Sequence, residues 1–167
     1  MLKTVVLVGM MGSGKTSVGK ELAKSLNLDF VDVDHEIEKK CKKTIPEIFK
    51  KKGEKYFRNI EEKMCNKIIN NDVKIISLGG GAFANEKIRK KIKKHALSVW
   101  INVGIESLCL RLEKSKNKRP LLDYTNLKKS IKDILDKRKK IYEKADFVVN
   151  VKSDNKKKVI EKIIKIL

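Results

Sequence analysis

The sequence predicts a three-layer α/β/α domain in which helices cover both faces of a five-stranded parallel sheet. Short, continuously apolar segments alternate with longer segments in which apolar residues recur every three or four positions. Such apolar segments are typical of strands buried on both faces, as in parallel sheets covered by helices. No Pro/Gly/Ser-rich linker and no internal repeat divides the 167 residues. We therefore expect a single domain over residues 1–167.

Five apolar segments are predicted to be strands. They are residues 3–8, 29–33, 73–78, 96–103 and 147–151. The first is rich in β-branched residues and ends at Gly9, and the third ends at a run of glycines. Because ligands bind at the carboxyl ends of strands in parallel sheets, the residues that follow each strand are candidate site residues.

The segments between and after the strands are predicted to be helices. They are residues 15–26, 35–42, 44–70, 85–94, 105–115, 127–143 and 155–166. The long one begins with Thr44-Ile-Pro-Glu47, the pattern of an N-terminal capping box, and is expected to break near Gly53. The regular alternation of helices with strands is what a sheet covered on both faces requires.

The net charge of +20 is typical of nucleic-acid-binding proteins, but the kind of charge does not favour that class. Lysines make up 36 of the 41 basic residues and occur in almost every segment, whereas aromatic residues make up only 5%. Proteins that read nucleic acids use arginine forks and stacked aromatic rings. We interpret the lysines as a solvated surface that attracts anionic ligands, and we expect no nucleic-acid partner.

Membrane and secretory classes are also disfavoured. No apolar run approaches the ~20 residues of a membrane span, and the first residues lack the features of a secretion signal. Cys41, Cys65 and Cys109 are odd in number and have no metal-binding spacing, so we expect reduced thiols. The prediction is a cytoplasmic protein with no membrane partner.

Residues 9–16 carry the strongest chemical signal. They match G-x-x-x-x-G-K-[ST] in full, between a predicted strand and a predicted helix. Residues expected around nucleotide phosphates are Gly9, Met11, Gly12, Ser13, Gly14, Lys15 and Thr16. Lys15 would contact the β- and γ-phosphates, and the Thr16 hydroxyl would bind Mg²⁺. The motif predicts binding of ATP or GTP with Mg²⁺ but does not identify the group that accepts phosphate.

Two acids follow the second strand. Residues two apart on a strand point to the same side, so Asp32 and Asp34 would both face the site. One could hold the water shell of Mg²⁺, and the other could orient an attacking hydroxyl or accept its proton. The alternative is a helix cap plus a solvated acid, and Asp34 could cap a helix beginning at residue 35. No Asp ends the third strand, so Asp32 is the expected metal partner.

Glycines and arginines supply the remaining candidates. Gly79, Gly80 and Gly81 would expose backbone amides to a polar ligand, although a flexible turn would look the same. Arg58 and Arg138 lie in distinctive contexts, as does Arg119, which precedes Pro120 in a basic loop. Guanidinium groups bind carboxylates through paired hydrogen bonds, so these arginines suggest an anionic acceptor. Neither His35 nor His95 is expected to act as a base, and both are expected to point away from the site.

These motifs, in this order, resemble those of the shikimate kinase family over residues 3–166. Besides the phosphate loop, the two acids and the triple glycine, they include Gly-Glu-x-x-Phe-Arg-x-x-Glu at 53–61. Arg-Pro-Leu-Leu at 119–122 and Arg-x-x-x-Tyr at 138–142 complete the set. The sequence departs from the family at 139–141, which reads Lys-Lys-Ile instead of a segment with proline, and at 153–156, where the family often has an arginine.

The resemblance implies a P-loop fold of the nucleoside-monophosphate-kinase-like type. It implies a lid over residues 112–124 and an acceptor-binding helical segment over 33–62. The implied reaction transfers the γ-phosphate of Mg-ATP to the 3-hydroxyl of shikimate, a step in the biosynthesis of chorismate and aromatic amino acids. The family is usually monomeric.

The resemblance also implies roles for individual residues. Residues that match Arg58 and Arg138 hold the shikimate carboxylate, and those that match Asp34 and the triple glycine hold its hydroxyls. Asp34 matches the group near the reacting oxygen. The resemblance also covers the nucleotide side. Asp32 matches an acid in the water shell of Mg²⁺. Arg119 matches a lid arginine that reaches the transferring phosphate, and Arg111 matches an arginine that stacks on adenine.

Other functions remain open from sequence alone. Another small P-loop kinase, acting on gluconate or a nucleotide, would share the phosphate loop. A nucleoside acceptor would favour aromatic stacking groups over paired arginines and backbone amides. A basic, nucleic-acid-associated P-loop module would show salt-sensitive binding and no need for Asp34. A non-catalytic relative is disfavoured because every expected site residue is present.

Overall fold

The computed structural model describes residues 3–70, 72–152 and 155–167, and it contains one five-stranded parallel sheet in the order β2-β3-β1-β4-β5. The strands are β1 (Thr4–Val8), β2 (Asp29–Asp32), β3 (Lys74–Ser77), β4 (Ala96–Val103) and β5 (Phe147–Val151). All neighbouring strands are parallel. The predicted fold class and all five predicted strands are confirmed.

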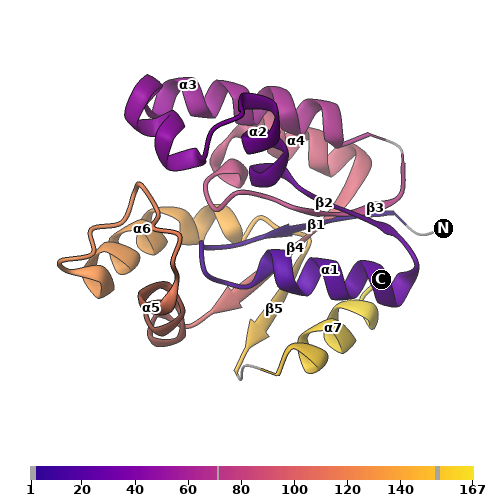
Figure 1. Cartoon of the computed structure of the whole chain (residues 1–167). Helices are drawn as coiled ribbons and strands as arrows, with labels where there is room; N and C mark the ends of the chain where they lie inside the picture. The colour runs from indigo at the N-terminus through magenta and orange to yellow at the C-terminus, as the bar shows by residue number, and fades with distance from the viewer. Residues whose placement is uncertain (1–2, 71, 153–154) are drawn as a thin grey trace.

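Helices cover both faces of this sheet (Figure 1). They are α1 (Lys15–Leu26), α2 (Val33–Cys41), α3 (Ile45–Ile68), α4 (Glu86–His95), α5 (Ile105–Lys114), α6 (Leu127–Tyr142) and α7 (Lys156–Ile164). In Figure 1, α1 and α7 lie below the sheet, and α2, α3 and α4 lie above it. Within the described part of the chain, no helix is long and apolar enough to cross a membrane.

The start and the break of α3 follow from local sequence. Thr44 accepts a hydrogen bond from the N–H of Glu47 at 3.4 Å, and the Glu47 carboxylate accepts one from the N–H of Thr44 at 2.7 Å. This is the predicted capping box. Gly53 interrupts the helix with φ 80° and ψ 171°, a conformation that glycine adopts without a steric cost. The predicted break near Gly53 is therefore confirmed.

Two local features differ from the sequence prediction. The second helix begins at Val33, two residues before the predicted start, so Asp34 lies in a helix and not on a strand. A short 3₁₀ helix, η1 (Ala82–Ala84), follows the triple glycine and was not predicted. Both features lie next to the carboxyl ends of strands, where they affect the candidate site.

The sheet register brings distant segments together. Every residue of β1 is buried, and Leu7 near its end is paired with Ser77 of β3. On the other side of β3, Ser77 is paired with Asp32. The ends of β1, β2 and β3 therefore lie side by side, and the loops that follow them share one edge of the sheet.

Candidate active site

The phosphate loop connects β1 to α1 with backbone geometry that depends on glycine. Gly12 and Gly14 have φ of 79° and 90°, in the left-handed region that disfavours side chains. A methyl group on Gly12 would also lie 2.9 Å from Cγ of Leu112. The loop thus has the wrapped shape in which amide groups and the N-terminus of α1 can face an anion.

Lys15, the first residue of α1, is the buried cation of this loop and is only 7% exposed. Its Nζ donates hydrogen bonds to the carbonyl oxygens of Gly9 and Met10, both at 2.9 Å. Burial lowers the pKa of Lys15 to about 8, although the nearby Asp34 carboxylate acts in the opposite direction. The ammonium group is therefore held at the loop by neutral partners, which a phosphate could replace.

Thr16 and Asp32 lie next to each other at the edge of the phosphate loop. The Thr16 hydroxyl donates to Asp32 Oδ2 at 2.6 Å, and Asp32 Oδ1 accepts from the N–H of His35 at 3.2 Å. Asp32, not Asp34, is thus the N-cap of α2, and the suggestion that Asp34 caps the helix is wrong. A hydroxyl and a carboxylate are oxygen donors that suit Mg²⁺, so these residues fit the expected metal.

Asp34 lies in the first turn of α2 with one oxygen directed inward. Its Oδ1 is buried and has no hydrogen-bond partner among the described residues. Burial, reinforced by the neighbouring Asp32 charge, raises the pKa of Asp34 to about 6. Asp32 and Asp34 do line the same cleft, but because of the helix start and not because of strand alternation.

A second buried acid, Glu61, was not among the predicted site residues. It is 1% exposed, and its Oε2 accepts a 2.7 Å hydrogen bond from Nη1 of Arg58. Its other oxygen, Oε1, is buried without a partner in the described part of the chain. Burial raises the pKa of Glu61, and Arg58 opposes this shift. The available signal was its position three residues after Arg58, on the same face of a predicted helix.

The carboxylates of Glu61 and Asp34 both lie against Gly79. A methyl group on Gly79 would lie 2.6 Å from Asp34 Oδ1 and 2.8 Å from Glu61 Oε1. Only the absence of a side chain lets both carboxylates approach the end of β3. Two unpaired acceptor oxygens therefore face the same point beside the cleft.

The other two glycines lie against arginines. A methyl group on Gly81 would lie 2.5 Å from Nη2 of Arg58, so this guanidinium covers Gly81. The carbonyl oxygen of Gly80 accepts a 3.1 Å hydrogen bond from Nη1 of Arg138. The structure thus brings together Arg58 and Arg138, which are far apart in the sequence, at the triple glycine.

The α5–α6 connection, at the left in Figure 1, supplies Arg119. Residues 116–121 line the same cleft, which has a volume of about 950 Å³. Nε of Arg119 is buried without a partner in the part of the chain that the structure describes. The backbone N–H of Arg119 donates to the Tyr124 hydroxyl at 3.0 Å, and Lys118 Nζ lies 4.1 Å from the centre of the Tyr124 ring.

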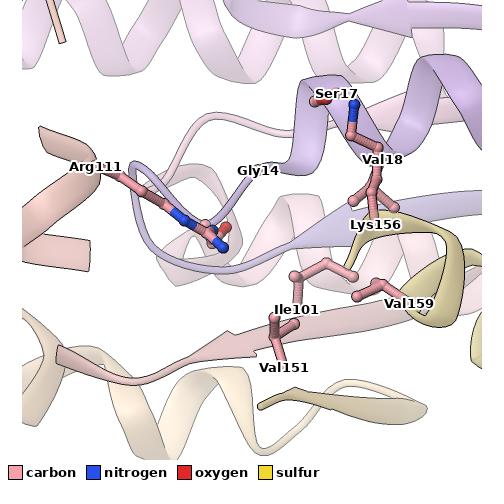
Figure 2. Close-up of a pocket in the computed structure, with 9 residues that line it drawn as sticks. Gly14, Ser17, Val18, Ile101, Arg111, Val151, Lys156 and Val159 are labelled. Carbon is pink, nitrogen blue, oxygen red and sulfur yellow. The ribbon is translucent and has the colours of Figure 1, made fainter. Parts of the chain in front are cut away.

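A second, smaller cavity of about 270 Å³ also borders the phosphate loop, at Ser13 and Gly14 (Figure 2). Figure 2 shows Arg111 reaching from α5 toward Gly14, and Nη1 of Arg111 donates to the carbonyl of Gly12 at 3.3 Å. Its other walls are Ser13, Ser17, Val18, Ile101, Val151, Lys156 and Val159. The mostly apolar walls suit a planar base. Of the segment 153–156, residues 153 and 154 lie outside the described residues.

Neither histidine contributes its side chain to the hydrogen bonds described above. His35 is exposed but does line the larger cleft, so the expectation that it points away is wrong. His95 ends α4 and does not line either cavity.

Comparison with known proteins assigns this chain to a family. A family model described as "Shikimate kinase" matches residues 11–167. The chain is also 43% identical over 164 residues to the shikimate kinase of Thermodesulfovibrio yellowstonii, covering 98% of this chain and 94% of that protein. The chain belongs to the shikimate kinase family. The resemblance seen in the sequence motifs is confirmed, and the protein is an ATP-dependent phosphotransferase.

Solved structures agree with this assignment. The shikimate kinase from Acinetobacter baumannii in complex with shikimate superposes with a TM-score of 0.94 and is 34% identical. The match covers 99% of this chain and 93% of that one. A gluconokinase from Sinorhizobium meliloti is 13% identical, with a TM-score of 0.60 and coverage of 98% and 90%, which shows a shared fold alone.

Proposed function

We propose that this protein transfers the γ-phosphate of ATP to the 3-hydroxyl of shikimate, giving shikimate 3-phosphate and ADP. The observation that carries this proposal is a single cleft lined by Lys15, Asp34, Arg58 and Arg138. The cleft thus combines a phosphate-binding group, a carboxylate for a hydroxyl, and two guanidinium groups for a carboxylate. An acceptor that carries both a carboxylate and hydroxyls fits this combination.

On the acceptor side, Arg58 and Arg138 would bind the substrate carboxylate. Three of the five N–H groups of Arg58 donate to Glu54 and Glu61, so two remain for a ligand. Both guanidinium groups lie at the triple glycine, where backbone groups can bind the substrate hydroxyls. Fixing the carboxylate at one end orients the hydroxyl at the other, which converts binding energy into alignment.

Asp34 would align the reacting hydroxyl and accept its proton. Its buried Oδ1 lacks a partner, so a substrate O–H would satisfy an acceptor that burial otherwise leaves unpaired. Above the raised pKa of about 6 the carboxylate is ionised and able to take the proton as the new O–P bond forms.

On the nucleotide side, the loop residues Gly9 to Thr16 would hold the phosphates. Lys15 would exchange its carbonyl partners for β- and γ-phosphate oxygens, which are stronger acceptors. Arg119 would place a second cation on the transferring phosphate, and its unpaired Nε is available for that contact. Charge stabilisation of this kind provides most of the catalysis in phosphoryl transfer.

Thr16 and Asp32 are the residues we assign to Mg²⁺. Their hydrogen bond of 2.6 Å places the two oxygens together at the edge of the phosphate loop. Thr16 would contribute its hydroxyl, and Asp32 would orient the surrounding water. When bound with ATP, Mg²⁺ neutralises charge on the β- and γ-phosphates.

Two further parts of the site have proposed roles. Residues 112–124 would act as a lid that excludes water, which otherwise competes for the phosphate. The helical segment 33–62 would carry the acceptor-binding groups. The smaller cavity would take adenine, with Arg111 against the base and Lys156 in place of the arginine often found in the family.

We further propose that the protein acts as a monomer on small molecules, without a nucleic-acid partner. We further propose a cytoplasmic location, for which the free thiols of Cys41, Cys65 and Cys109 are suited. The product would serve the biosynthesis of aromatic amino acids.

Coupled release of ADP from Mg-ATP, with and without shikimate at near-physiological salt, tests the function. We expect a rate that saturates with shikimate and little release in its absence. Gluconate, nucleosides and nucleic acid serve as alternative acceptors or activators. Stimulation by one of these instead of shikimate would overturn the proposal.

A further inference from the structure

Tyr142, the last residue of α6, is a buried polar group with no role in the reaction described so far. It is 1% exposed and does not line the substrate cleft. Its ring stacks on Trp100 of β4, with ring centres 5.7 Å apart and planes at 29°. Ring stacking and burial account for the aromatic part of the side chain, but a hydroxyl at this depth needs a partner of its own.

The hydroxyl contacts both substrate loops. It donates a hydrogen bond to the carbonyl oxygen of Gly80, in the triple glycine, and lies 3.8 Å from the sulfur of Met10, in the phosphate loop. Burial raises the pKa of Tyr142, so the phenol keeps its proton and remains a donor. One O–H group therefore stands between the segment that would bind nucleotide and the segment that would bind acceptor.

The Gly80 carbonyl is also shared with an acceptor-binding residue. Nη1 of Arg138, one helical turn before Tyr142, donates to the same oxygen at 3.1 Å. Because the peptide group is planar, holding this carbonyl also fixes the direction of the Gly81 N–H, which points the opposite way. The position of the carbonyl thus affects both a guanidinium group and a backbone donor at the acceptor site.

The two loops touch at the same place. A methyl group on Gly80 would lie 3.0 Å from the backbone nitrogen of Met11 and 3.7 Å from the carbonyl oxygen of Gly9. Among the described residues, no side chain separates Gly80 from the phosphate loop at this point. A change in the phosphate loop on nucleotide binding would therefore reach Gly80 directly.

We propose that Tyr142 is a positioning residue that couples nucleotide binding to acceptor binding. Its hydroxyl holds the Gly80 carbonyl against the phosphate loop, so that ordering of that loop by nucleotide sets Arg138 and the Gly81 N–H for the acceptor. Coupling between two sites is reciprocal, so acceptor binding tightens nucleotide binding by the same factor. The inference rests on the proposed function, because it takes shikimate as the acceptor.

Isothermal titration calorimetry on the full chain measures this coupling. The Kd of shikimate is determined with and without saturating Mg-ADP, and the ratio of the two values is the coupling factor. We expect a factor of about 5 or more in the wild type, in the usual range for coupled sites. In Tyr142→Phe, which keeps the ring and loses the hydroxyl, we expect the factor to fall to within about twofold of one.

Tyr56→Phe is the matched control, since it makes the same chemical change on an exposed ring of α3 and should keep the wild-type factor. Met10→Leu is a second variant, which removes the sulfur contact at similar volume and should lower the factor by about twofold. The melting temperature of each variant is recorded alongside.

The outcomes separate the inference from the function on which it rests. A wild type that binds Mg-ADP but not shikimate would overturn the proposed acceptor. A wild type that binds both without coupling, or Tyr142→Phe and Met10→Leu variants with the wild-type factor, would overturn the role of Tyr142 and leave the proposed function intact. A lower melting temperature with an unchanged factor would show that the hydroxyl supports only the fold. If Tyr142→Phe does not fold, the Met10→Leu factor decides, and a wild-type value there would overturn the coupling role.

Discussion

The nucleotide side and the acceptor side of the cleft are built in different ways. The nucleotide side comes mainly from one continuous segment, residues 9–16, with Asp32 added from the end of β2 and Arg119 from the α5–α6 connection. The acceptor side combines Asp34 of α2, Arg58 of α3 and Arg138 of α6 with the glycines after β3. The phosphate loop on the nucleotide side is mostly backbone around the buried Lys15, whereas the acceptor side is mostly side chains of opposite charge.

This difference affects how each side responds to substitution. A phosphate loop can bind any nucleoside triphosphate, so the identity of the acceptor must be read by the other side. There, Asp34 and Glu61 each have a buried oxygen without a partner among the described residues. Buried acceptors without partners weaken the fold unless a ligand pairs with them, so we expect the acceptor side to be both specific and sensitive.

The largest effect is expected on the nucleotide side. Lys15→Ala removes the buried cation of the loop, and we expect kcat to fall by about 10³-fold or more, because charge on the transferring phosphate would lose its nearest partner. Coupled ADP release measures the loss. Lys24→Ala, at the exposed end of the same helix, is the control and should behave as wild type. A Lys15→Ala variant that kept more than about a tenth of the wild-type rate would contradict this role.

Asp34→Asn should impair the phosphoryl-transfer step without impairing nucleotide binding. We expect kcat to fall by about 10²–10³-fold, while the Kd of Mg-ADP measured by calorimetry changes by less than about twofold. Because burial raises the pKa of Asp34 to about 6, wild-type kcat should also fall as the pH drops through about 6, where the carboxylate becomes neutral and cannot accept a proton.

Two controls test the assignment of that pH dependence. The acidic limb should disappear in Asp34→Asn, and it should persist in Asp136→Asn, a substitution at an exposed position of α6. A wild-type profile that stays flat between about pH 5 and pH 7 would argue against Asp34 as the proton acceptor.

Arginine-to-lysine substitutions then distinguish a guanidinium group that binds the ligand from one that only supports the fold. Arg58→Lys keeps the charge but loses paired hydrogen bonds, so the KM for shikimate should rise by about 10–100-fold with a smaller effect on kcat. Nη1 of Arg89 instead donates to the carbonyls of Phe83 and Ala84, at 2.7 and 2.8 Å. Arg89→Lys should lower the melting temperature and leave KM within about twofold. Equal KM values in the two variants would show that Arg58 does not bind the acceptor.

The smallest effect is expected from the outer partner of Arg58. Glu54 is 51% exposed and lies 3.3 Å from the guanidinium, so the pair contributes little, and Glu54→Gln should change the KM for shikimate by less than about twofold. Glu61→Gln removes the charge of the buried partner at 2.7 Å and should raise that KM by about tenfold. Initial rates at varied shikimate concentrations give the KM of each variant. A larger change for Glu54→Gln would reverse the assignment of inner and outer partner.

Features written in a short stretch of sequence were predicted correctly. The phosphate loop, the capping box at Thr44 and the break at Gly53 each depend on a few adjacent residues, and the structure has all three. The three central strands, β1, β3 and β4, were found because burial on both faces leaves a continuous apolar run, whereas the edge strands β2 and β5 are only partly buried. The roles assigned to the site residues stay predictions, although the structure brings the principal ones into one cleft.

Features that depend on packing between distant segments were missed or wrongly explained. Asp34 was placed on a strand because the sequence does not show that Asp32 caps a helix beginning at Val33. Glu61 was overlooked because glutamate is almost always exposed, and only the assembled fold shows that it is buried beside Gly79. The contacts of Tyr142 join segments more than a hundred positions apart at their widest, which no local pattern reveals.

Because β3 lies between β1 and β2 in the sheet, the active site cannot assemble until β3 has been synthesised. The phosphate loop and both acids are synthesised early, but β1 and β2 have no hydrogen bonds to each other and both await β3. Arg138 follows still later, shortly before the last strand. A chain growing from its N-terminus therefore carries unpaired strand edges for much of its synthesis, and these are the segments that a chaperone would need to shield.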